Sequence, residues 1–268
     1  MANEVWARGD AYEAYVGRWS RPVAARFLDW LAVPPGRRWL DVGCGTGALT
    51  GTVLAAAAPA EVTGVDASEA FLALARSRLT DRSAARFAAR FIAGDARALP
   101  VPDASADVVV SGLTLNFVPE PATAVAEFAR AVAPGGLVAA YVWDYADGMA
   151  MMRHFWDAAT SLDPAAAALD EGRRFSICST GALSGLWSAA GLSGVTTRPI
   201  DTTAVFVDFD DYWTPFLGGT GPAPGYVASL SEEHRATLRD LLRERLPRAA
   251  DGSIPLLARA LAVRGTAA

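Results

Sequence analysis

The sequence predicts an α/β fold: a doubly wound, Rossmann-like sheet of seven strands whose last two strands form an antiparallel pair. Three observations predict it. Between residues 39 and about 143, short apolar stretches alternate with longer amphipathic ones, a pattern typical of parallel βαβ units. The first apolar stretch runs directly into alternating glycines at Gly43, Gly45 and Gly47. Near the end of the chain, two long stretches alternate apolar and polar residues as strands do.

The elements follow in order along the chain. Ser20 is a candidate N-cap, and with Pro22 in the first turn it begins a helix that ends near Leu31. Strands are predicted at 38–42, 61–65, 89–93, 106–111, 136–143, 194–206 and 254–264. Helices are predicted at about 47–58, 68–79 and 120–132, with further helical segments at 144–192 and 208–247. Ser68 is expected to cap the second of these helices, and Pro134-Gly135-Gly136 to break the third before the fifth strand.

The length of 268 residues is consistent with one large domain that contains insertions. Residues 1–143 are expected to hold the N-terminal helices and the ligand-binding, Rossmann-like half. Residues 144–268 complete the same domain. Two helical insertions, at about 144–178 and 208–250, are expected to form a lid over the carboxyl edge of the sheet, at the site of a second ligand.

Composition excludes several classes of function. The formal charge is −5, which disfavours a nucleic-acid or anionic-membrane partner. Every cationic side chain is arginine, so lysine chemistry is excluded. Two cysteines, Cys44 and Cys178, are too few for a disulfide framework. The apolar runs are too short to span a bilayer and the N-terminus lacks a signal-peptide pattern, so a soluble, cytoplasmic protein is expected.

Three aspartates stand where three successive predicted strands end: Asp41, Asp66 and Asp95. Glycines after the first strand allow backbone amides to approach a ligand closely. Asp66 lies where a doubly wound sheet places a carboxylate that accepts hydrogen bonds from ribose hydroxyls. Asp95, followed by Ala96, offers an acceptor beside a free amide, which suits the edge of an adenine. Each aspartate has a structural alternative as a turn or helix-end residue.

In this order and spacing, the motifs resemble those of the class I S-adenosylmethionine-dependent methyltransferases, in the branch that methylates small molecules (methyltransferase type 11). The resemblance covers roughly residues 12–143. It implies a fold that binds S-adenosylmethionine and transfers its methyl group to a small, partly apolar metabolite. The residues that it places at the cofactor are Tyr15, Arg18, Asp41, Gly43, Cys44, Gly45, Gly47, Asp66, Ala67, Asp95, Ala96 and Ser111.

Two alternatives stay open at this stage. Gly43, Gly45 and Ala48 also satisfy the dinucleotide pattern, for which Asp66 would bind the ribose equally well. An NAD(P)-dependent oxidoreductase is therefore the second hypothesis. Asp41 disfavours it, because a carboxylate near the loop would repel a pyrophosphate but attract a sulfonium. The third hypothesis is a non-catalytic, cofactor-binding protein of the same fold.

The acceptor side is less defined. His154, after the fifth strand, is a candidate general base, although an ordinary polar position on a helix is the alternative. The aromatic-rich segment 206–219 would either line an apolar acceptor pocket or pack an insertion onto the sheet. Exposed aromatics on the insertions could support a homodimer. No cluster of carboxylates suggests a metal site.

Overall fold

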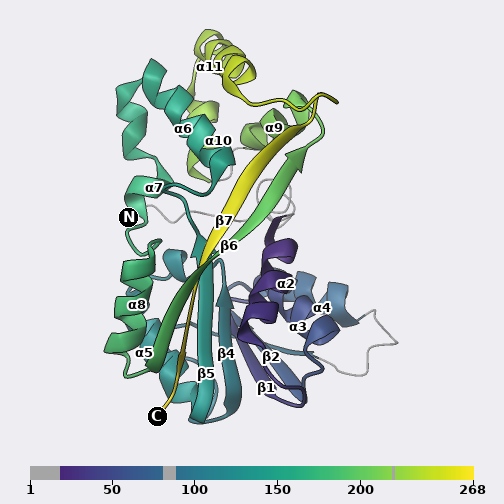
Figure 1. The fold of residues 1–268 in the computed structure, drawn as a ribbon, viewed down its shortest axis with the longest axis vertical. Coiled ribbons are helices and arrows are strands. Elements are labelled where there is room, and N and C mark those ends of the chain that lie inside the picture. The colour runs from purple at the N-terminus through teal and green to yellow at the C-terminus, as the bar shows by residue number, and fades with distance from the viewer. Residues whose placement is uncertain (1–18, 81–88, 219–220) are drawn as a thin grey trace. The chain divides into compact units, whose positions relative to one another are not determined.

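The computed structural model describes residues 19–80, 89–218 and 221–268. Within these ranges one sheet of seven strands has the order β3-β2-β1-β4-β5-β7-β6 (Figure 1). The strands are β1 (Arg38–Val42), β2 (Glu61–Asp66), β3 (Ala89–Ala93), β4 (Ala106–Gly112), β5 (Val132–Trp143), β6 (Ser193–Phe206) and β7 (Ile254–Thr266).

The strand directions confirm the predicted sheet. Strands β1 to β5 pair in parallel, for example Asp41 with Gly64 of β2 and with Val110 of β4. Strand β7 runs antiparallel to β5. Early in β5, the amide of Gly135 donates to the carbonyl of Ala267, directly after β7. Directly after β5, the amide of Asp144 donates to the carbonyl of Arg259, which lies earlier in β7. Since the parallel strands all end at one edge, the loops after β1, β2 and β4 are brought together there.

Helices cover both faces of the sheet. Figure 1 shows α2, α3 and α4 on one side of the parallel strands and α5 and α8 on the other. Their bounds are α2 (Ser20–Leu31), α3 (Ala48–Ala56), α4 (Glu69–Thr80), α5 (Pro121–Ala131) and α8 (Thr180–Ala189). Apolar residues on α2 and α5, such as Phe27 and Phe128, are fully buried against the sheet side of each helix. Ser68 caps α4 as predicted, by accepting from the amide of Phe71.

One predicted boundary is wrong. Pro134-Gly135-Gly136 does not end helix α5, which already stops at Ala131. Strand β5 begins at Val132 and includes Pro134-Gly135-Gly136. These three residues lie where the register with β4 changes: Ala106 pairs with Val132, but Val108 pairs with Leu137. A bulge of this kind accommodates proline and glycine within a strand because the extra residues leave the hydrogen-bond ladder.

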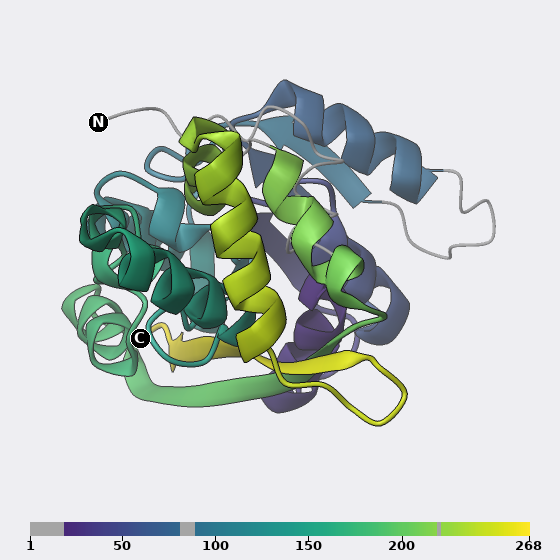
Figure 2. The ribbon, with the colours of Figure 1, turned by 90° about the horizontal axis from the view of Figure 1, so that it is seen from above.

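The chain divides into two compact units. The first, here called the sheet unit, comprises Ser20–Val142, Ile177–Ile200 and Leu261–Ala268. The second, the helical unit, includes Trp143–Ser176 and Asp201–Ala260. Its helices are α6 (Ala150–Leu162), α7 (Glu171–Arg174), α9 (Phe209–Trp213), α10 (Pro222–Ser229) and α11 (Glu232–Arg245), with short 3-10 turns at Pro164–Ala168 and Thr214–Gly218; Figure 2 shows them from above. The lid role of 144–178 and 208–250 stays a prediction.

Aromatic side chains form the interior of the helical unit. Phe155 stacks on Phe216 with ring centroids 4.5 Å apart, and Tyr212 donates its hydroxyl to the carbonyl of Met151 at 3.0 Å. Every aromatic side chain from Phe206 to Phe216 is buried. The segment 206–216 therefore packs the unit in which it lies.

No helix of the described ranges is long and apolar enough to cross a bilayer.

Candidate cofactor-binding site

The loop after β1 has the conformation that its glycines predict. Gly43, Gly45 and Gly47 have φ angles of +72°, +52° and +86°, in the left-handed region that favours glycine. The amides of Gly43 and Cys44 both donate to the carbonyl of Val65, at the end of β2, at 2.7 and 3.1 Å. The glycine loop, residues 43–47, is thus fixed to the neighbouring strand.

Gly45 and Gly47 have different surroundings. A Cβ on Gly47 would lie 2.9 Å from a terminal methyl of Leu79 in α4, so the loop is in close contact with that helix. A Cβ on Gly45 would have no described atom within 4 Å. The backbone at Gly45 is therefore open on that side, which is the condition for a ligand to approach it closely.

Asp66 connects the end of β2 to this loop. Its two carboxylate oxygens accept from the amides of Gly45 and Ser68, both at 2.8 Å. Burial raises the pKa of Asp66, and the two amide donors oppose that rise. Each carboxylate oxygen can accept two hydrogen bonds and accepts one here, so one lone pair on each oxygen remains for a diol.

Asp41 lies beneath the loop and is 1% exposed. Its Oδ2 accepts from the hydroxyl of Thr50 at 2.6 Å, whereas its Oδ1 is buried and has no partner among the described residues. Burial raises the pKa of Asp41 to about 7, with Thr50 acting in the opposite direction. An unpartnered buried oxygen of this kind favours a cationic or hydrogen-bond-donating group nearby.

Asp95 is in a different environment from the other two aspartates. Its side chain is 47% exposed, and it accepts hydrogen bonds from both the backbone and the guanidinium of Arg97. These bonds lower the pKa of the Asp95 carboxyl. Ala96, beside it, is partly buried. The adenine contact proposed for this pair stays a prediction.

The remaining predicted cofactor residues lie in different environments. Cys44 is buried, and burial raises the pKa of its thiol, so it is a packing residue rather than a nucleophile. Ser111, at the end of β4, is buried, and its hydroxyl has no partner in the described ranges. Ala67 is exposed. Tyr15 and Arg18 lie outside the described residues.

The candidate general base belongs to α6 in the helical unit. His154 is partly buried, and burial lowers the pKa of its imidazole while Asp157 raises it. The neutral imidazole is the form that a general base needs near pH 7. Its role stays a prediction. The second histidine, His234, is exposed in the first turn of α11.

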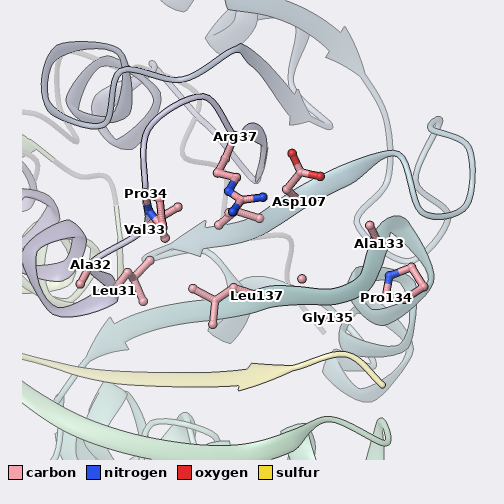
Figure 3. Close-up of a pocket in the computed structure, with 12 residues that line it drawn as sticks. Leu31, Ala32, Val33, Pro34, Arg37, Asp107, Ala133, Pro134, Gly135 and Leu137 are labelled. Carbon is pink, nitrogen blue, oxygen red and sulfur yellow. The ribbon is translucent and has the colours of Figure 1, made fainter.

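A hollow of about 250 Å³ lies in the sheet unit at the opposite edge, where the strands begin (Figure 3). Its walls come from the end of α2, the start of β4 and the Pro134–Gly136 bulge, and Arg37 and Asp107 supply its charged groups. None of the predicted cofactor residues lines it. Because ligands of doubly wound sheets bind at the carboxyl edge, this hollow is not the cofactor site.

Sequence reasoning missed two polar residues after β4. The hydroxyl of Thr114 donates to the carbonyl of Gly43 at 2.8 Å. The Nδ2 of Asn116 is buried and without a partner in the described part of the chain. The sequence contains one signal for Thr114: strand order places β4 beside β1, so a hydroxyl after β4 falls next to the glycine loop.

Comparison with known proteins shows the family of this chain. Residues 40–140 match the methyltransferase domain family. The ubiquinone/menaquinone biosynthesis C-methyltransferase UbiE of Methylobacterium nodulans is 34% identical over 172 residues, which are 60% of this chain and 68% of that protein. The YcgJ protein of Bacillus subtilis has the same fold, with a TM-score of 0.60 at 18% identity over 91% of this chain and 97% of that chain.

A methyltransferase structure with bound product is also similar. Phosphoethanolamine N-methyltransferase 2 of Haemonchus contortus, solved with S-adenosylhomocysteine, has a TM-score of 0.58 at 17% identity over 97% of this chain and 57% of that chain. The residues present here suit such a group, because an open backbone at Gly45 lies beside the Asp66 carboxylate and the unpartnered Asp41 oxygen is close in sequence. The chain belongs to the class I methyltransferases and uses S-adenosylmethionine as its cofactor.

Proposed function

We propose that this methyltransferase acts on a small, partly apolar metabolite and releases S-adenosylhomocysteine. The observation that supports the donor side is the glycine loop bonded to Asp66 at the carboxyl edge of the sheet. The relative named for ubiquinone and menaquinone biosynthesis makes a hydroquinone or phenol ring the first acceptor class to test. An oxygen on such a ring makes the ortho carbon or the oxygen itself nucleophilic.

Within this proposal each residue has a separate task. Asp66 would hold the ribose hydroxyls, and Asp95 with Ala96 the adenine. The unpartnered oxygen of Asp41 would provide negative charge near the donor's cationic end. The bound donor supplies a methyl group on a sulfonium, which is displaced in line by the acceptor. Such a reaction depends mainly on alignment and on exclusion of water.

His154 would remove a proton from the acceptor, because its lowered pKa keeps the imidazole neutral. Methyl transfer can proceed by positioning of the acceptor alone, without a general base. The role of His154 is therefore tested separately from the methyl transfer itself. A His154→Gln variant should retain donor binding and lose turnover with acceptors that must be deprotonated. Unchanged turnover across the pH range would exclude this role.

The test of the proposal has two parts. Titration calorimetry should show binding of S-adenosylhomocysteine and no binding of NADH. Release of S-adenosylhomocysteine should then be measured across a panel of hydroquinones, phenols, amines and carboxylic acids. Donor binding without turnover on any member would support a non-catalytic protein of the same fold and contradict the proposal.

A further inference from the structure

We infer that Thr114 is a positioning residue for the donor site, because its hydroxyl fixes the glycine loop from the β4 side. The inference rests on the proposed function, since it concerns the same site. Thr114 lies two residues after the end of β4, and β4 pairs with β1 so that Asp41 faces Val110. The exits of the two strands therefore lie side by side.

The hydroxyl of Thr114 lies 2.8 Å from the carbonyl oxygen of Gly43 and 3.1 Å from that of Gly112. A hydroxyl has one proton to donate, and the shorter distance favours Gly43. On the other side, the glycine loop donates its amides to Val65 and Asp66 of β2. Strand β2 therefore holds the amides of the loop, and the segment after β4 holds its first carbonyl.

The side chain of Thr114 also fits the loop by shape. A Cβ on Gly43 would lie 2.1 Å from the methyl carbon of Thr114 and 2.6 Å from its Cβ. Gly43 and Thr114 are thus in close contact through carbon atoms as well as through the hydrogen bond. These two contributions can be separated, because valine keeps the shape of threonine without its hydroxyl, and serine keeps the hydroxyl without the methyl.

The backbone before Thr114 is itself constrained. Leu113 has a φ of +58°, which is uncommon for a residue with a side chain. Its amide donates to the carbonyl of Tyr141 in β5 at 2.8 Å, and a Cβ on Gly112 would lie 2.6 Å from the hydroxyl of the same tyrosine. The turn is therefore fixed to β5. It presents Thr114 in one position, which pre-organises the loop before the donor binds.

The experiment compares Thr114→Val, Thr114→Ser and Thr114→Ala, with S-adenosylhomocysteine as the calorimetric probe. We expect Thr114→Val to raise the dissociation constant about 3- to 10-fold, as expected for loss of one hydrogen bond. Thr114→Ser should stay within about twofold of the unmodified protein, because it retains the donor. Thermal unfolding of each variant shows whether it is folded.

A matched control is available in α3. Thr52 also donates its hydroxyl to a backbone carbonyl, that of Ala48 at 2.9 Å, but it does so within the helix. Thr52→Val should leave the dissociation constant unchanged. If Thr114→Val does not fold, the comparison of serine with alanine at position 114 replaces it, and tight binding by serine alone supports the inference.

Two results would overturn the inference. One is a Thr114→Val variant that binds as tightly as the unmodified protein. The other is equal weakening by valine and serine, which would show that packing and not the hydroxyl matters. Failure of the proposed function is distinguishable, because there the unmodified protein would bind S-adenosylhomocysteine but methylate none of the acceptors.

Discussion

The ends of β1 and β2 differ sharply from the end of β3, although each supplies an aspartate at the same edge of the sheet. Asp41 and Asp66 are buried or partly buried, and burial raises the pKa of both. Asp95 is exposed, and its bonds to Arg97 lower its pKa. The difference shows that position at a strand end does not define the electrostatics of a carboxylate; its neighbours do.

The largest expected effect concerns Asp41 and pH. Its pKa rises from 3.8 to about 7 on folding, so the folded protein holds this proton more tightly than the unfolded chain does. The protonated Asp41 therefore adds to the free energy of unfolding below pH 4, and this contribution is lost as the pH rises from about 4 through about 7. We expect a loss of about 4 kcal/mol in the free energy of unfolding over this window.

The measurement is denaturant unfolding of the ligand-free protein and of Asp41→Asn at several pH values. Asparagine cannot ionise, so the variant should lack this part of the pH dependence and exceed the unmodified protein in stability at pH 8. Asp95→Asn sharpens the comparison because the pKa of Asp95 is shifted in the opposite direction from that of Asp41. The lowered pKa of Asp95 gives stability that is lost as the pH falls below about 4. Identical pH profiles for all three proteins would contradict the assignment.

The next effect concerns the glycine loop between Asp41 and Asp66. Gly43→Ala should lower the free energy of unfolding by about 3 kcal/mol, because left-handed backbone strain adds to a clash with Thr114. Gly36→Ala is the control: Gly36 has a φ of +78°, but a Cβ there meets no described atom within 4 Å. It should cost only about 1 kcal/mol. Equal losses would show that the contact with Thr114 is unimportant.

A smaller effect is expected for donor binding at Asp66. Asp66→Ala should weaken binding of S-adenosylhomocysteine by about 1 to 3 kcal/mol, because charge-assisted bonds to the ribose are lost. Calorimetry gives the value directly. Unchanged affinity would exclude the ribose role.

The smallest effect is expected at Asp95. Asp95→Ala should change the free energy of unfolding by less than about 0.5 kcal/mol, since an exposed ion pair contributes little. Its effect on donor affinity should be smaller than that of Asp66→Ala, because solvent screens an exposed carboxylate. A larger loss of affinity at Asp95 would reverse the order and identify the end of β3 as the main determinant of binding.

Much of the sheet could be predicted because its local signals agree. Strand β3 has the predicted bounds, 89–93, and β1 has the predicted bounds, 38–42. Apolar runs that end in glycine or aspartate define such strands from their own residues. The start of β5, predicted at 136 and found at Val132, could not be predicted, because the irregularity at Pro134–Gly136 depends on the register with β4.

By itself the sequence determined the parallel sheet, the left-handed glycines and the aspartates at one edge, because these follow from the periodicity of side chains and from the freedom of glycine. Only the tertiary structure decided that Asp41 is buried beside Thr50, that Asp95 faces Arg97 in solvent, and that Thr114 meets Gly43 across 71 positions of sequence. Burial raises the pKa of Asp41 and Asp66, and burial is not encoded in a residue or its immediate neighbours, whereas the pKa of Asp95 is lowered by Arg97, two residues away.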